Sequence, residues 1–68
     1  MIYIQNESIN NARIYIGENV AIGKDVNATL PQGNVLMQDA DVKIRAKSVL
    51  LKSGVRISNS KFVIQKYE

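Results

Sequence analysis

Basic side chains alternate in the second half of the chain, and their spacing is the pattern that most readily suggests chemistry. Lys43, Arg45 and Lys47 occupy every second position, and Arg56 follows one repeat later. Because residues two apart on a strand point to the same face, these side chains would form a basic row suited to phosphates or an acidic polysaccharide. Lysines on a strand also discourage edge pairing. We therefore favour a solvated face and keep ligand contact as the alternative.

Tyr3 and Tyr15 are the other candidate ligand contacts. If they lie on neighbouring turns of the chain, their rings would form a column on which a sugar could stack, although stacking between successive strands is the more common role of such rings. The chain has only three tyrosines and one phenylalanine. None of them is interleaved among the alternating basic residues, so we expect no nucleic-acid partner.

Catalytic and metal chemistry have no visible residues in this sequence. The chain has no histidine and no cysteine, so a serine nucleophile has no imidazole partner and zinc has no usual ligand set. Asp39 and Asp41 are two apart, but calcium requires about six to eight oxygen ligands, and we interpret this segment as a solvated corner. We predict a non-enzymatic protein without cofactor or metal.

The elements that would position these residues are apolar–any–apolar triplets, which recur every six or seven residues along most of the chain. An interval of nine before Val35 and one of twelve after Ile2 are the exceptions, and the longer interval leaves room for a degenerate triplet around Ile9. The triplets begin at Ile2, Ile14, Val20, Val26, Val35, Val42, Val49, Val55 and Phe62.

This periodicity predicts an all-β fold, a short parallel β-solenoid of about three triangular coils. Within a triplet the outer residues point one way and the middle one the other, as strands require. Between triplets stand Gly, Asn, Asp and Ser, which tolerate the backbone conformations of corners. Three short strands then make one coil of about 18 to 21 residues, with the outer residues of each triplet stacked inside. Residues 1–68 form a single such domain or the C-terminal fragment of a longer protein.

Three middle positions contradict a simple solvent face. Leu36, Leu50 and Val63 are apolar and would be exposed on an isolated solenoid. A chain of 68 residues without cysteine is also below the roughly 70 to 80 residues at which one core gives comfortable stability. We therefore expect these three residues to mediate self-association, or packing on a parent domain.

Residues 16–26, IGENVAIGKDV, resemble the hexapeptide repeat of left-handed β-helices. The best-known proteins with that repeat are acyltransferases, and the resemblance would imply a histidine base. This chain has no histidine, so the resemblance implies coil geometry without that chemistry.

Residues 33–62, GNVLMQDADVKIRAKSVLLKSGVRISNSKF, are similar to small β-solenoid repeats at the ends of secreted and surface proteins of Bacteroidetes. The shared pattern is a series of apolar strands separated by Asp-rich, Ala-Lys, Leu-Lys-Ser-Gly and Asn-Ser corners, closed by a phenylalanine. The sequence departs from it at Gln38-Asp39-Ala40, where a Ser-Gly corner is common. The resemblance implies a fold and a surface or secreted location, but no activity.

The sequence thus favours a structural or adhesion module of a bacterial surface or secreted protein that associates with itself. Two alternatives remain: a glycan-binding module, and a filament-forming β-helix similar to bactofilins. No apolar run approaches the roughly 18 residues of a membrane span, so we expect no membrane insertion. No signal peptide is recognisable at the first residues, which leaves a cytoplasmic location open.

Overall fold

The computed structural model describes residues 1–24 and 35–67, and all regular structure within them is β-strand. Each predicted triplet within these residues lies in a strand, and the degenerate segment around Ile9 forms one as well. The predicted triplet at Val26 lies outside the described residues. The strands are β1 (Ile2–Ile4), β2 (Glu7–Ile9), β3 (Ala12–Ile16), β4 (Asn19–Ile22), β5 (Val35–Gln38), β6 (Asp41–Ala46), β7 (Ser48–Leu51), β8 (Val55–Ser58) and β9 (Lys61–Lys66).

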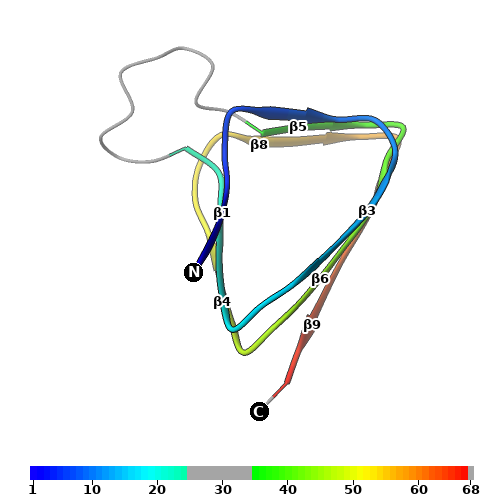
Figure 1. Ribbon diagram of the computed structural model, residues 1–68. Helices are drawn as coiled ribbons and strands as arrows, with labels where there is room; N and C mark the ends of the chain where they lie inside the picture. Colours follow the sequence, from blue (N-terminus) through cyan, green and yellow to red (C-terminus); the bar gives the residue numbers. More distant parts are fainter. Residues whose placement is uncertain (25–34, 68) are drawn as a thin grey trace.

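The strands form three parallel, three-stranded sheets, in the orders β1-β4-β7, β2-β5-β8 and β3-β6-β9. Consecutive strands therefore belong to different sheets, and each strand pairs with the one three places later in the chain. Viewed from one end, the sheets make the three sides of a triangle (Figure 1). The all-β prediction and the predicted parallel pairing are confirmed.

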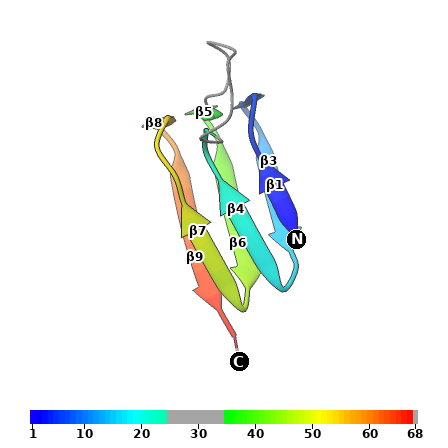
Figure 2. The same cartoon turned by 90° about the vertical axis from the view of Figure 1, so that its left-hand side faces the viewer.

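The strands stack in three layers, which we call the first tier (β1–β3), the second tier (β4–β6) and the third tier (β7–β9). Figure 2 shows β1, β4 and β7 side by side, with the second tier between the other two. Paired residues on neighbouring strands are separated by a certain number of residues in the sequence, which is 18 for Ile2 and Val20 and 20 for Val35 and Val55. These intervals agree with the predicted repeat of about 18 to 21 residues. The segment between β4 and β5 makes the interval longer for other pairs.

The core runs along the inside of the triangle and is centred on the second tier. Parallel register places one residue of each tier in a column, and Ile4, Ile22 and Leu51 form one such column. The inward residues of the second tier are covered by neighbours on both sides, as the close packing of an interior requires. The large side chains of this tier that are fully buried are Val20, Ile22, Val35, Met37, Val42 and Ile44.

Polar residues and glycine make the corners, as predicted. Asn6, Asp39 and Asn59 have φ values of 54°, 53° and 48°, and asparagine and aspartate tolerate this left-handed region better than other residues with a Cβ. Gly23 has φ 117°, and its backbone N–H donates to the carbonyl oxygen of Ile4, in the first tier, at 2.9 Å. The corners thus continue the hydrogen bonding between tiers beyond the ends of the strands.

One strand shows a face opposite to the predicted one. We expected Ile14 and Ile16 inside and Tyr15 outside, but both isoleucines are 67% exposed while Tyr15 packs against the core. The register explains this, because Tyr15 pairs with buried Ile44 and Ile14 pairs with exposed Lys43. Apolar alternation defines two faces, but it does not decide which one lies inside.

Candidate functional site

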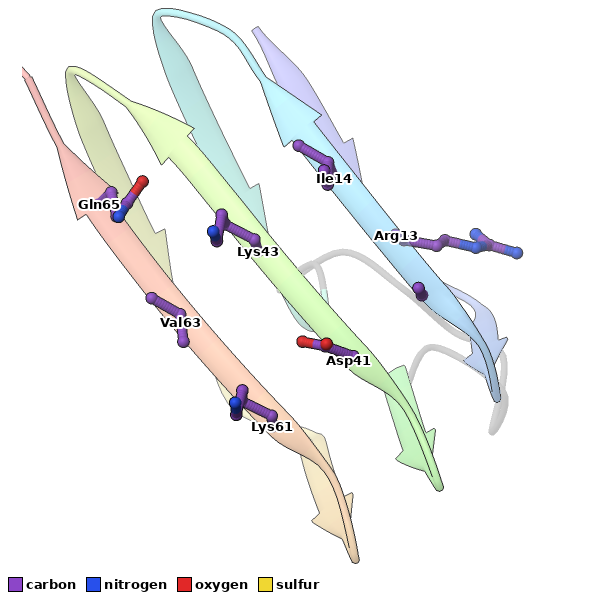
Figure 3. Close-up of a pocket in the computed structure, with 8 residues that line it drawn as sticks. Arg13, Ile14, Asp41, Lys43, Lys61, Val63 and Gln65 are labelled. Carbon is purple, nitrogen blue, oxygen red and sulfur yellow. The ribbon is translucent and has the colours of Figure 1, made fainter.

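The outer face of the β3-β6-β9 sheet carries a shallow, open groove of about 320 Å³ (Figure 3). Its charged side chains are mainly basic, with Lys43 and Lys61 on neighbouring strands and one carboxylate, Asp41, between them. Exposed Ile14 and half-buried Val63 add apolar surface. A groove of this kind can hold a flexible anionic or amphipathic chain, but it does not enclose a small molecule. It is lined by Ala12, Arg13, Ile14, Asp41, Lys43, Lys61, Val63 and Gln65.

The predicted basic row is present along β6 and its end, but it does not continue from tier to tier. Lys43 and Arg45 both point outward from the β3-β6-β9 sheet, whereas Arg56 lies on the β2-β5-β8 sheet. In register, Lys43 lies between Ile14 and Val63, so its column contains no second cation. Lys47 stands at the following corner and forms an ion pair with Glu18, with 3.6 Å between Nζ and Oε1. A basic column across the tiers is therefore absent at these positions.

The two candidate tyrosines do not form a column either. Tyr3 is exposed on β1 and Tyr15 is half-buried on β3, so both belong to the first tier and to different sheets. Stacking of both rings on one sugar is incompatible with this placement. Of the residues in the basic row, Arg45 has an aromatic neighbour, because its guanidinium carbon lies 5.9 Å from the centre of the Tyr67 ring.

The residues expected to mediate self-association are distributed around the molecule. Leu36 lies on β5, Leu50 on β7 and Val63 on β9, which belong to the three different sheets. Leu50 is 59% exposed and Leu36 is 37% exposed, whereas Val63 is half-buried. Each points outward on its own side of the triangle, so the three do not form one patch.

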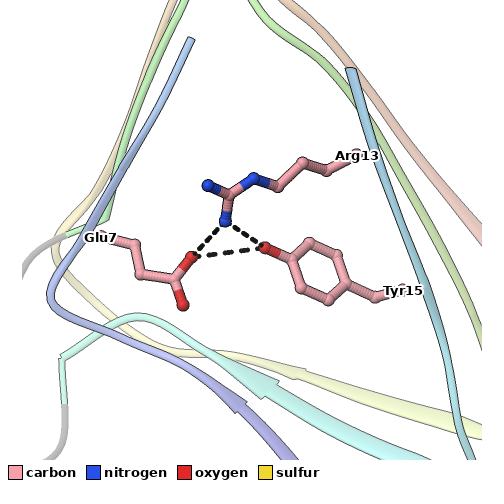
Figure 4. Close-up of polar contacts among 3 residues, drawn as sticks. All are labelled: Glu7, Arg13 and Tyr15. Carbon is pink, nitrogen blue, oxygen red and sulfur yellow. Dashed lines mark hydrogen bonds and ion pairs between the residues drawn. The ribbon is translucent and has the colours of Figure 1, made fainter. Parts of the chain in front are cut away.

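A polar cluster that the sequence analysis did not identify lies within the first tier (Figure 4). Arg13 Nη1 donates to Glu7 Oε2 at 2.9 Å and to the Tyr15 hydroxyl at 3.2 Å, and that hydroxyl lies 3.3 Å from the same carboxylate oxygen. In register, Glu7 pairs with Val35, and Arg13 pairs with Val42. All three polar residues therefore occupy positions at which the second tier has core residues. We call Glu7, Arg13 and Tyr15 the polar cap.

The Arg13 guanidinium of the polar cap stays charged across the ordinary pH range. The hydrogen bond to Tyr15, supported by the Glu7 carboxylate, raises the pKa of the Arg13 guanidinium above its ordinary value, so arginine remains a cation throughout. The sequence signal for this cluster is the alternation of faces along a strand, in which residues two apart lie on the same face. Glu7 is two residues before buried Ile9, and Arg13 is two residues before Tyr15.

The opposite end of the molecule is apolar. Leu51 is 57% exposed, Ile57 48% and Ile64 37%, although each occupies a column of inward-facing residues. Residues at the end of a stack lack a following layer, and their inner side chains remain in contact with water. We call this surface the apolar end; it consists of Val49, Leu51, Val55, Ile57, Phe62 and Ile64.

Residues 1–24 and 35–67 contain no group of three metal-ligating side chains and no histidine or cysteine with which to build a nucleophilic site. Within the same residues there is no helix of the length and apolarity needed to cross a membrane. Comparisons of the chain with protein-family models, curated proteins and solved structures find no match. The interpretation of function therefore depends on the groove, the polar cap and the apolar end.

Proposed function

We propose that this chain is a short parallel β-solenoid of three triangular coils that serves as a non-enzymatic structural module and associates with copies of itself. The observation that carries the proposal is the apolar end, where three large aliphatic side chains of inward-facing columns remain exposed. Solenoid proteins normally cover such an end with a polar capping repeat. Open edge strands there also present unpaired backbone groups, which template pairing with a further strand.

The three tiers are the support for the solenoid class. Each tier contributes one strand to every sheet, and the register is parallel throughout the three sheets. The similarity to surface modules of Bacteroidetes adds a surface or secreted location as a prediction. A module of this kind would extend or anchor a larger assembly.

The solution mass tests the proposal directly. Multi-angle light scattering over a hundredfold range of concentration should give a mass above the 7.6 kDa of one chain. A value that remains at 7.6 kDa over the whole range, in a folded sample, would contradict self-association. Circular dichroism on the same sample confirms that the chain is folded and rich in β-structure.

Glycan binding is the second candidate, and the groove on the outer face of the β3-β6-β9 sheet favours it. Lys43 and Lys61 would contact the acidic groups of a polysaccharide, while Ile14 and Val63 contact its apolar ring faces. The test is retention on a heparin column at low salt, compared between the wild type and Lys43→Ala. The control is Lys52→Ala, because Lys52 lies at the corner after β7 and outside the residues that line the groove. Glycan binding at the groove requires that only Lys43→Ala elutes earlier.

A further inference from the structure

We infer that two copies of this chain join third tier to third tier through their apolar ends, and that the polar cap stops the assembly at a dimer. This inference rests on the proposed self-association and specifies which surfaces meet. The two ends of the molecule offer three pairings: cap to cap, cap to apolar end, and apolar end to apolar end. Only the last pairing buries apolar side chains on both sides.

The polar cap closes the first tier. Ile4 and Ile9 are 0% and 1% exposed although their tier is the last one at that end. Their counterparts in the third tier are Leu51 and Ile57, which are about half exposed. The difference between two residues of the same column shows that the first tier is already covered.

Stacking the first tier of one copy on the third tier of another would bury the polar cap. Continued in register, it would place Glu7 over Val55 and Arg13 over Phe62 of the next copy. The Glu7 and Arg13 side chains are 33% and 41% exposed, so both charged groups are in contact with water in the single chain. The free energy needed to remove both charges from water is larger than the free energy that exposed ion pairs at the rim of the contact contribute. An open head-to-tail filament is therefore disfavoured.

The apolar end is suited to a two-fold axis. A rotation of 180° turns the second copy over, so the edge strands of the two third tiers run antiparallel and can exchange backbone hydrogen bonds. The same operation brings Leu51, Ile57 and Ile64 of both copies into one apolar layer. Because each apolar end is then covered and each polar cap faces water, the assembly is closed.

The charges of the third tier give this arrangement a distinctive salt dependence. Residues 47–67 carry five basic side chains and no acidic one, so two third tiers repel each other at their rims. Added salt screens that repulsion and should strengthen the dimer. Cap-to-end stacking would instead bring the basic tier against Glu7 and Glu18, and salt should weaken it. These basic residues are Lys47, at the corner before the third tier, and Lys52, Arg56, Lys61 and Lys66.

Two neighbouring leucines provide matched variants for the test. Leu51 belongs to the apolar end and Leu50 points outward, yet they are 57% and 59% exposed and lie on the same strand. Light scattering of the wild-type chain should give a mass that reaches twice 7.6 kDa and stays there, and raising sodium chloride from 50 to 300 mM should lower the dissociation constant several-fold. Leu51→Glu should weaken the dimer at least a hundredfold, whereas Leu50→Glu should leave it within threefold of the wild type.

Spin labels give a second readout that does not alter the apolar end. The chain has no cysteine, and Ser8 and Arg56 lie in one outward column, in the first and third tiers. The inferred dimer requires a clearly longer label-to-label distance for Ser8→Cys than for Arg56→Cys, because each Ser8 is two strand spacings, about 10 Å, farther from the contact. In head-to-tail stacking, each label is displaced from its copy in the next chain by the same repeat length, so the Ser8→Cys and Arg56→Cys variants would give equal label-to-label distances.

Each outcome decides between the inference and the function on which it rests. A mass that climbs with concentration, or equal label distances, overturns the closed dimer but leaves self-association in place. A monomer at every concentration overturns both. Loss of the dimer in Leu50→Glu but not in Leu51→Glu overturns the apolar end as the contact. If Leu51→Glu fails to fold by circular dichroism, the label distances decide.

Discussion

The first and third tiers occupy equivalent places at the two ends of the molecule, yet they present opposite surfaces to water. In the first tier, Glu7, Arg13 and Tyr15 form hydrogen bonds across positions that are apolar elsewhere in the stack, and the isoleucines beneath them are buried. In the third tier the corresponding positions are Val55, Phe62 and Ile64. The same backbone arrangement therefore presents a polar surface at one end and an apolar surface at the other.

The cover over the first tier consists of side chains rather than of an additional element of structure. The described residues contain no helix, and three polar residues of the first tier stand where the other two tiers have apolar residues. The larger, polar side chains reach across the end and keep their charges in water, as the terminal repeats of solenoids require. The difference between the ends can consequently be removed or increased by point substitution.

The largest expected effect comes from removing the polar cap. Glu7→Val combined with Arg13→Val replaces both residues by the ones that occupy these columns in the second tier, Val35 and Val42. Because both ends would then be apolar, we expect head-to-tail growth, seen as a mass that rises with concentration in light scattering. The control is Glu18→Val with Lys47→Val, which removes an exposed ion pair away from the cap. A cap variant that remains a dimer would contradict the capping role.

A smaller effect, confined to stability, should separate two residues of one inward column. Ile22→Ala should lower the free energy of unfolding by about 2–5 kcal/mol, because Ile22 is fully buried between two tiers. Leu51→Ala should lower it by less than about 1 kcal/mol, because more than half of that side chain already contacts water. Urea denaturation at concentrations where the chain is monomeric measures both. Equal losses would mean that the third tier is as well packed as the second.

The smallest expected effect distinguishes two glycines that follow strands of different tiers. An added Cβ at Gly23 would lie 2.7 Å from the Ser53 carbonyl oxygen, and its φ of 117° is unfavourable for alanine. At Gly17 the Cβ would meet the flexible end of the Ile2 side chain instead. We expect Gly23→Ala to cost about 2 kcal/mol or more and Gly17→Ala to change stability by less than about 1 kcal/mol. Thermal denaturation gives the order, and the reverse order would contradict the contacts described for Gly23.

The strands and their repeat could be predicted from the sequence because they depend on local alternation and on corner residues. The intervals from Ile2 to Val20 and from Val35 to Val55 agree with the predicted coil. The segment at Gln38-Asp39-Ala40, which departs from the Ser-Gly pattern, still forms a corner. There Asp39 takes a positive φ and accepts a hydrogen bond from Asn59, so aspartate replaces glycine at a position that it tolerates.

The direction of β3 and the location of the polar cap could not be predicted from hydrophobicity. Two isoleucines flanking a tyrosine suggest isoleucines inside, yet the partners of the tyrosine hydroxyl among the described residues, Glu7 and Arg13, lie inside. That preference depends on a contact between different strands and is not visible in either strand alone. The sequence also cannot distinguish Leu50 from Leu51. Leu50 is exposed because it points outward, whereas Leu51 points inward and is exposed because no further tier covers it. Which tier is the last is not visible in the sequence.

The second tier has a consequence for how this protein can vary. It touches neither end, and residues of β5 and β6 recur in the third tier at an interval of 20, as from Val42 to Phe62. A tandem duplication of one such segment would lengthen the rod by a layer while preserving the residues at both extremities. The number of layers and the chemistry of the ends can thus change independently. A duplication changes the number of layers, and a single substitution at Glu7 or Arg13 changes the chemistry of one end.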